Sequence, residues 1–156
     1  MNSSIAEPKS SRRPQAAAEE LVSMHVGGQL VGIPVRIVQD ILGFQRITRV
    51  PLAAREIAGV LNLRGRIVTA IDLRQRLGMD AVVSDRPSMS VVCEHGGELY
   101  SLLIDQIGEV LQPPADRFDT DLTPLTQCWR EFSRGIYRLD NQLLVLLDVG
   151  RVLAFN

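Results

Sequence analysis

The sequence feature that most constrains the fold is an internal repeat. When the glycine pair at 27–28 is aligned with the pair at 96–97, an offset of 69, GGQLVGIPVRIVQDIL overlies GGELYSLLIDQIGEVL. At an offset of 76, GVLNLRGRIVTAIDLRQRL overlies GIYRLDNQLLVLLDVGRVL. Self-similarity at this period indicates that one small structural unit occurs twice in the 156-residue chain.

The repeated unit has the pattern of a small all-β structure. LVSMHV and QLVGIPV flank the first glycine pair, and MSVVCEH and ELYSLLI flank the second, which is the spacing of two-residue hairpins. Short strands with glycine turns favour barrels, because closure removes exposed strand edges. We therefore predict one all-β domain over 21–156, with a few short helices and about five strands in each of two barrels. The first repeat covers about 21–80 and the second about 88–156. Residues 1–20, rich in Ser, Pro, Ala and charge, predict a disordered tail.

Three short helices are predicted between the strands. The segment from Pro51 to Gly59 begins with proline and ends with glycine, as a short helix does. Asp72 opens the turn DLRQRL, which Gly78 closes. The insert at 111–134 contains TQCWREFSR, in which Trp129 is expected to anchor a helix in the core.

The residue types that usually carry catalysis or bind metals do not occur in a recognisable motif in this sequence. His25 and His95 each precede a glycine hairpin, without a second ligand at metal spacing, so both are expected to be ordinary strand residues. Cys93 and His95 share a strand face but lack the third group of a catalytic triad. A five-stranded barrel is also expected to be too narrow for a substrate cavity. We predict no catalytic residue, no metal and no cofactor, and a chain that is not an enzyme.

Charge and cysteine content favour a cytoplasmic protein that docks other proteins. The two cysteines form no CxxC motif, which suits reduced thiols. Residues 21–80 hold eight arginines and four acids, whereas 81–156 hold six arginines and eleven acids. Arginine suits bidentate carboxylate pairing at interfaces, although a codon bias towards arginine explains the same composition. RNA binding through the arginines of 46–76 is an alternative, but 4% aromatic residues and a net charge of -1 argue against nucleic acid.

The stretch from Leu21 to Leu153 resembles the CheW family, the coupling proteins of bacterial chemotaxis. The residues that carry the resemblance are, in order, IPVRIVQDILGFQRITRVP, GVLNLRGRIVTAIDLRQRLG, LLIDQIGEVL and GIYRLDNQLLVLLDVGRVL. The resemblance implies two intertwined SH3-like five-stranded barrels and a non-enzymatic adaptor. It implies two partners, the cytoplasmic tip of chemoreceptors and the regulatory domain of a CheA-type histidine kinase. The implied place is the cytoplasm, at receptor arrays, with membrane association only through the receptors. A coupler in a non-chemotactic chemosensory pathway is the alternative.

The resemblance also implies the residues that would contact these partners. Asp40 and Arg64 are expected to form an ion pair beside the receptor-binding groove. In the second repeat the equivalent residues are Glu109 and Asp140, two acids, so this pairing is expected only once. The other implied receptor- or kinase-binding positions, not divided between the two partners, are Val35, Val38, Gly59, Met89, Ser101 and Val110. Gly59 would allow close backbone approach beside the predicted helix at 52–58.

Overall fold

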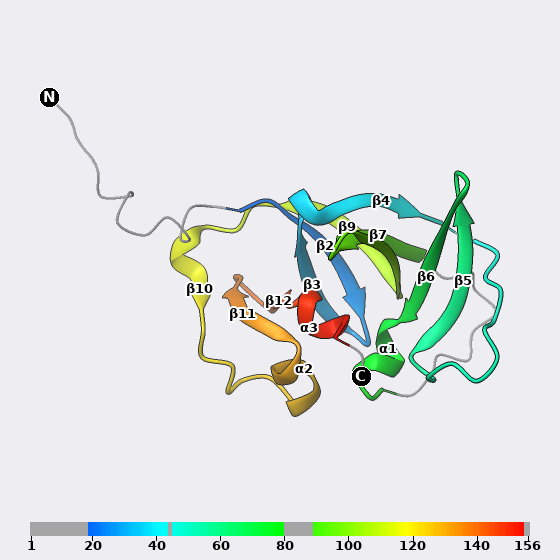
Figure 1. Cartoon of the computed structure of the whole chain (residues 1–156). Coiled ribbons are helices and arrows are strands. Elements are labelled where there is room, and N and C mark those ends of the chain that lie inside the picture. Colours follow the sequence, from blue (N-terminus) through cyan, green and yellow to red (C-terminus); the bar gives the residue numbers. More distant parts are fainter. Residues whose placement is uncertain (1–18, 44, 80–88, 155–156) are drawn as a thin grey trace, which may run out of the picture.

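The chain folds into two β-sheets, seen side by side in Figure 1. The computed structural model describes residues 19–43, 45–79 and 89–154, so most of the predicted tail lies outside the described residues. The first sheet contains, in spatial order, β10 (Phe118–Asp119), β11 (Ser133–Arg138), β12 (Leu143–Leu147), β3 (Gln29–Pro34), β2 (Leu21–Val26) and β9 (Gln106–Leu111). The second contains β4 (Val38–Leu42), β7 (Met89–His95), β8 (Glu98–Ile104), β6 (Arg66–Asp72) and β5 (Ile57–Leu63). The predicted all-β class is confirmed, and the two-residue β10 is an addition to the first sheet.

The two sequence repeats exchange their first hairpins. Read from β9, the first sheet runs β9, β2, β3, β12, β11, and the second runs β4, β7, β8, β6, β5. At each position in these two orders the strands are equivalent in the two repeats, so that β9 corresponds to β4, β2 to β7, β3 to β8, β12 to β6 and β11 to β5. The hairpin β2–β3 of the first repeat therefore completes the sheet of the second, and β7–β8 completes the sheet of the first. The parallel pairs β3–β12 and β6–β8 are the seams where the repeats meet. The repeats are thus intertwined, as the resemblance implied.

The central strands β3 and β12 bury consecutive side chains, and because alternate side chains of a strand point to opposite faces, both faces of the sheet are covered there. The largest apolar cluster lies between the sheets and includes Met24, Ile71, Leu102 and Trp129. Two smaller clusters fill the barrel interiors, one around Leu21, Leu30, Tyr137, Leu144 and Leu146, and one around Leu61, Val68 and Ala70. Trp129 is 5% exposed, which confirms its predicted place in the core. The shared central cluster fixes the two barrels relative to one another.

The short helices follow the predicted signals in two places and depart from them in a third. Helix α1 (Leu73–Arg76) begins after Asp72, whose Oδ1 accepts the N–H of Gln75 at 3.3 Å. Helix α3 (Val149–Val152) begins in the same way after Asp148. Helix α2 (Gln127–Glu131) lies in the predicted segment. The described residues also contain two single 3-10 turns, η3 (Val35–Ile37) and η4 (Ala115–Arg117).

The helix predicted over 52–58 is wrong. Residues 51–56 form turns and irregular backbone, and strand β5 begins at Ile57. Gly59 lies inside that strand with φ at +149°, so it does not end a helix. A proline followed later by a glycine marks a loop leading into a strand as readily as a short helix.

Candidate functional site

Arg64 and Asp40 form the predicted ion pair. Nη2 of Arg64 donates to Oδ2 of Asp40 at 2.7 Å, and the Arg64 side chain is 75% exposed. Arg64 lies in the turn between β5 and β6 with φ at +53°, and Asp40 lies on β4. The hydrogen bond from Arg64, helped by the N–H of Ile41, lowers the pKa of Asp40 from its ordinary value. Because β4 and β5 are the two outer strands of the second sheet, the pair links one edge of that sheet to the hairpin at the other.

Gly59 brings the preceding loop onto β5. A Cβ at Gly59 would overlap the carbonyl oxygen of Thr48 and lie 2.7 Å from Cγ2 of Ile47. Thr48 and Val60 exchange two backbone hydrogen bonds of 2.8 Å each. The close approach predicted at Gly59 is therefore confirmed, although it is made with an extended loop and not with a helix. We call residues 45–56 the first-repeat loop.

The second repeat has an equivalent arrangement around Gly135. A Cβ there would overlap the ring of Phe118, and β10 pairs with β11 with Asp119 opposite Ile136. Since Ile136 is the repeat equivalent of Val60, Asp119 takes the place that Thr48 has in the first repeat. We call residues 112–126 the second-repeat loop.

The remaining predicted positions do not share one surface. Val35, Val38 and Met89 are half-buried and pack against the central cluster. Val110 is 56% exposed on β9, in the other sheet. Ser101 on β8 is fully buried and its Oγ has no hydrogen-bond partner, so its side chain is not available for contact with another protein.

A second ion pair, which the sequence did not predict, lies at the corresponding turn of the second repeat. Nη2 of Arg117 lies 3.3 Å from Oδ1 of Asp140, and Nη1 of Arg117 donates to the carbonyl of Arg138 at 2.8 Å. Here the acid is in the turn and the arginine outside it, the reverse of Arg64 and Asp40. The pair was missed because Arg117 belongs to the insert that the repeat alignment leaves out.

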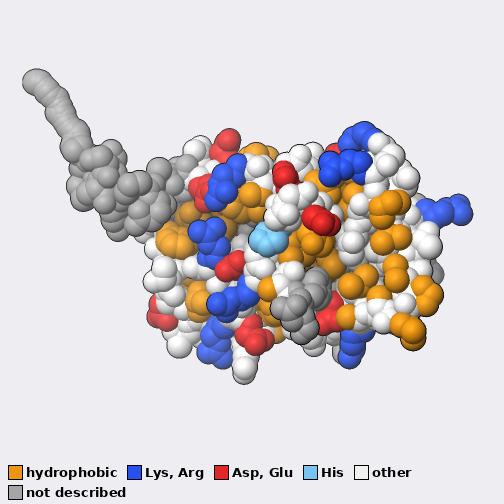
Figure 2. All heavy atoms as spheres, in the orientation of Figure 1, with side chains coloured by type: hydrophobic (Ala, Val, Ile, Leu, Met, Phe, Trp, Pro, Cys, Tyr) orange, Lys and Arg blue, Asp and Glu red, His pale blue; other side chains and the backbone are white. Residues whose placement is uncertain are grey.

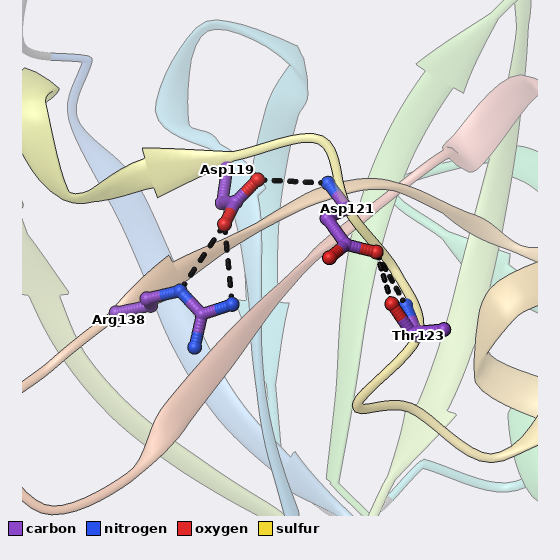
Figure 3. Close-up of polar contacts among 4 residues, drawn as sticks. All are labelled: Asp119, Asp121, Thr123 and Arg138. Atoms are coloured by element: carbon purple, nitrogen blue, oxygen red, sulfur yellow. Dashed lines mark hydrogen bonds and ion pairs between the residues drawn. The ribbon is translucent and has the colours of Figure 1, made fainter.

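Asp119 and Asp121 of the second-repeat loop are hydrogen-bonded by neighbouring groups, as Figure 3 shows. Asp119 accepts from Nε and Nη2 of Arg138 at 3.2 and 3.1 Å and from the N–H of Asp121 at 2.9 Å. Asp121 accepts from the hydroxyl and the N–H of Thr123. These hydrogen bonds, above all the N–H of Asp121 on Asp119 and the hydroxyl of Thr123 on Asp121, lower the pKa of both carboxyl groups.

A half-buried ion pair joins the two sheets. Asp105 is the single residue between β8 of the second sheet and β9 of the first. Its carboxylate accepts from Nε and Nη2 of Arg74 on α1, at 2.8 and 2.6 Å. The same carboxylate accepts the N–H of Gly27, in the β2–β3 turn, at 2.8 Å. The side chains of Arg74 and Asp105 are 26% and 28% exposed. Asp105 thus connects three segments from both sheets.

An open pocket lies beside the first-repeat loop. Its volume is about 430 Å³, and it is lined by Leu61, Ser90 and Leu103 of the second sheet and by residues that follow β4. Its lining includes Arg46 but none of the histidines, cysteines or acids.

Cys93 is the cysteine that the sequence analysis considered as a nucleophile. Cys93 is buried, and its burial raises the pKa of the thiol to about 12. Within residues 19–43, 45–79 and 89–154, no cluster of three or more histidine, cysteine or acidic side chains could hold a metal ion. The same ranges contain no helix with the length and apolar character needed to cross a membrane.

Comparisons with known proteins agree with the observed fold. The family model of the CheW-like domain matches residues 20–155. Chemotaxis protein CheW of Klebsiella aerogenes is 27% identical over 140 residues, which cover 90% of this chain and 84% of that protein. Protein PilI of Pseudomonas aeruginosa is 27% identical over 124 residues, covering 80% and 70%. The crystal structure of the scaffolding protein TtCheW from Thermoanaerobacter tengcongensis has the same fold, with a TM-score of 0.80 at 24% identity, over 89% of this chain and 94% of that one.

Proposed function

The chain belongs to the CheW-like family, and on this premise we propose that it is a non-enzymatic coupling protein that joins chemoreceptors to a CheA-type histidine kinase. The observation that carries the proposal is the shared core between the two barrels. Because this core holds both barrels in one orientation, a partner on one barrel is held at a defined position relative to a partner on the other. This is what a scaffold requires, and it needs no reactive group.

The two partners would use apolar and charged groups on separate faces. Half-buried Val38 and Met89 belong to the second sheet, and exposed Val110 belongs to the first. A receptor tip is a helical hairpin, and a helix docks through apolar side chains spaced along one face. Asp40 and Arg64 would fix the geometry of the surface beside β4. Individual contacts of this kind are weak, with dissociation constants around micromolar, and assembly gains strength from multivalency.

The same proposal gives the protein a place in the cell. We place it in the cytoplasm at receptor arrays on the inner face of the membrane, held there by the receptors. In this arrangement residues 21–156 act as one unit, with repeat boundaries near 80 and 88.

Separate co-elution of the purified protein with a kinase regulatory domain and with a receptor-tip fragment tests the proposal. We expect capture of both. Arg64→Ala and Val38→Glu should each weaken capture of at least one partner while the circular dichroism spectrum stays that of the wild type. Failure of the wild-type protein to capture either partner would contradict the function, whereas full capture by both variants would contradict only the residue assignment.

A coupler in another chemosensory pathway is the second candidate. The observation that favours it is the match to Protein PilI, a relative that does not carry a chemotaxis name. The two candidates differ in the kinase and receptors that are captured, so the co-elution is repeated with the kinase and receptor encoded beside the gene for this chain. Preference for a kinase from a pathway without flagellar control would favour the second candidate.

A further inference from the structure

The first-repeat loop is held firmly at both ends. Thr48 is hydrogen-bonded to Val60 on β5, over Gly59, and Ile47 packs against the cluster around Leu61 in the second sheet. At the other end Nε of Arg55 donates to Oε1 of Gln75 at 2.9 Å, and the carbonyl of Glu56 accepts the N–H of Asp72 at 2.8 Å. The segment between these attachments, residues 49–53, therefore projects from a fixed base.

The projecting segment exposes apolar surface in a strained backbone. Leu52 is fully exposed, at 105%, and Val50 is 42% exposed. Leu52 also has φ at +65°, in a turn closed by the N–H of Ala53 on the carbonyl of Val50 at 3.3 Å. A non-glycine residue in the left-handed region is strained, and such strain concentrates at functional sites. Figure 2 shows orange side chains gathered on the side of the molecule formed by β5 and this loop.

Two exposed arginines belong to the same loop as the exposed leucine. Arg46 and Arg49 are exposed and form no ion pair within the described ranges. Glu56 is the single acid between residues 45 and 56, which contain three arginines. The second-repeat loop provides an internal comparison, because it has the same position on its own sheet. Its charged groups Asp119 and Asp121 are satisfied by neighbours within that barrel (Figure 3). Leu125 is buried and Leu122 packs against the central cluster, so of these two equivalent loops the first-repeat loop is the one that presents large exposed apolar side chains.

We propose that the first-repeat loop is a preformed docking ridge, in which Leu52 enters an apolar recess on a partner protein while Arg46 and Arg49 pair with carboxylates at its rim. Guanidinium groups favour bidentate carboxylate pairing, and buried apolar anchors with charged rims are typical of binding hot spots. Gly59 is then a positioning residue, which allows Thr48 to lie against β5 and sets the direction of the ridge. The inference deepens the proposed coupling function, because it defines the chemistry of one partner surface. A protein partner is favoured over RNA because the ridge presents aliphatic groups and no aromatic platform.

The test compares Arg49→Glu, Leu52→Gly and their double variant with Arg130→Glu, a reversal of an exposed arginine on α2 that serves as the control. The probes are a kinase regulatory domain and a receptor-tip fragment, with polyuridylic acid as the RNA probe. We expect the double variant to bind at least one protein probe at least tenfold more weakly, and Arg130→Glu to bind like the wild type. Glycine adopts positive φ freely, so Leu52→Gly should melt at the same temperature as the wild type or higher. A purely structural role for Leu52 would instead lower the melting temperature.

Three results have distinct meanings. Wild-type affinity of the double variant for both protein probes overturns the ridge while leaving the coupling function intact. Loss of binding to polyuridylic acid, with both protein affinities unchanged, also overturns it in favour of RNA. If the wild-type protein captures neither protein probe, the coupling function fails, and the docking ridge fails with it.

Discussion

Replacement of Asp105 by asparagine should destabilise the protein by an amount that depends on pH. The change removes the ionised acceptor of Arg74 and weakens the acceptor of the Gly27 N–H, at the residue where the chain passes from one sheet to the other. Hydrogen bonds to charged groups contribute about 1.5–3 kcal/mol each, and partial exposure places this pair near the lower end. We therefore expect a loss of about 2 kcal/mol in the free energy of unfolding at pH 7, equivalent to a fall of roughly 4–8 °C in melting temperature for a chain of this size.

The sign of the pH dependence follows from the pKa of Asp105. The hydrogen bond from Arg74, followed by that from Gly27, lowers this pKa below its ordinary value of 3.8. A carboxyl group with a lowered folded-state pKa contributes stability above its unfolded-state pKa and loses it as the pH falls through the folded-state value. The difference between wild type and Asp105→Asn should thus be largest near neutral pH and shrink below pH 4.

Urea denaturation at pH 7 and pH 3 measures this difference. Glu19→Gln provides the matched control, because the Arg36–Glu19 pair is more exposed, at 66% and 33%, and joins no sheets. That control should change the free energy of unfolding by less than about 0.5 kcal/mol. Equal effects of the two substitutions at pH 7, or an Asp105→Asn effect of the same size at pH 3, would refute the reasoning.

Three further outcomes are expected. Gly135→Ala should destabilise the protein by about 1–3 kcal/mol in urea denaturation, because the new Cβ overlaps the ring of Phe118, and an unchanged midpoint would contradict the tight contact. A thiol reagent at pH 8 should label the half-buried Cys128 rapidly and Cys93 only after unfolding, since Cys93 is buried with a pKa of about 12; two rapid equivalents in the folded protein would argue against this. Trp129→Ala should lower the free energy of unfolding by about 3–5 kcal/mol, whereas a surface role for Trp129 would leave it nearly unchanged.

The features that could be predicted from the sequence depend on residues that are near one another in the chain or on a recognised motif. The glycine pairs identified the hairpins, and Asp72 identified the start of α1, because a two-residue turn and a helix cap each require particular residues at fixed positions. The pair Asp40 and Arg64 came from the family motif, and its geometry is confirmed. Whether these residues bind a partner remains a prediction.

The features that the sequence did not reveal depend on long-range placement. The partner of Asp140 is Arg117, which lies in the second-repeat loop; this loop occupies the position of the first-repeat loop, but its sequence does not align with it. The exposure of Leu52 depends on attachments at Thr48 and Arg55 to different elements, and an apolar residue in a sequence carries no sign of facing solvent. The glycine at 59 was identified as a close-approach position, but the pattern did not distinguish a neighbouring helix from a loop.

The exchange of hairpins indicates how such a chain could arise. A half-length polypeptide with one repeat would lack a partner for its hairpin, so it could complete a sheet only by trading that hairpin with a second copy of itself. Two such polypeptides would form a swapped homodimer with the strand order that both sheets of this chain share. Joining them end to end converts the dimer into a monomer and frees its two halves to diverge, which is how one ancestral contact surface could become two with different specificities.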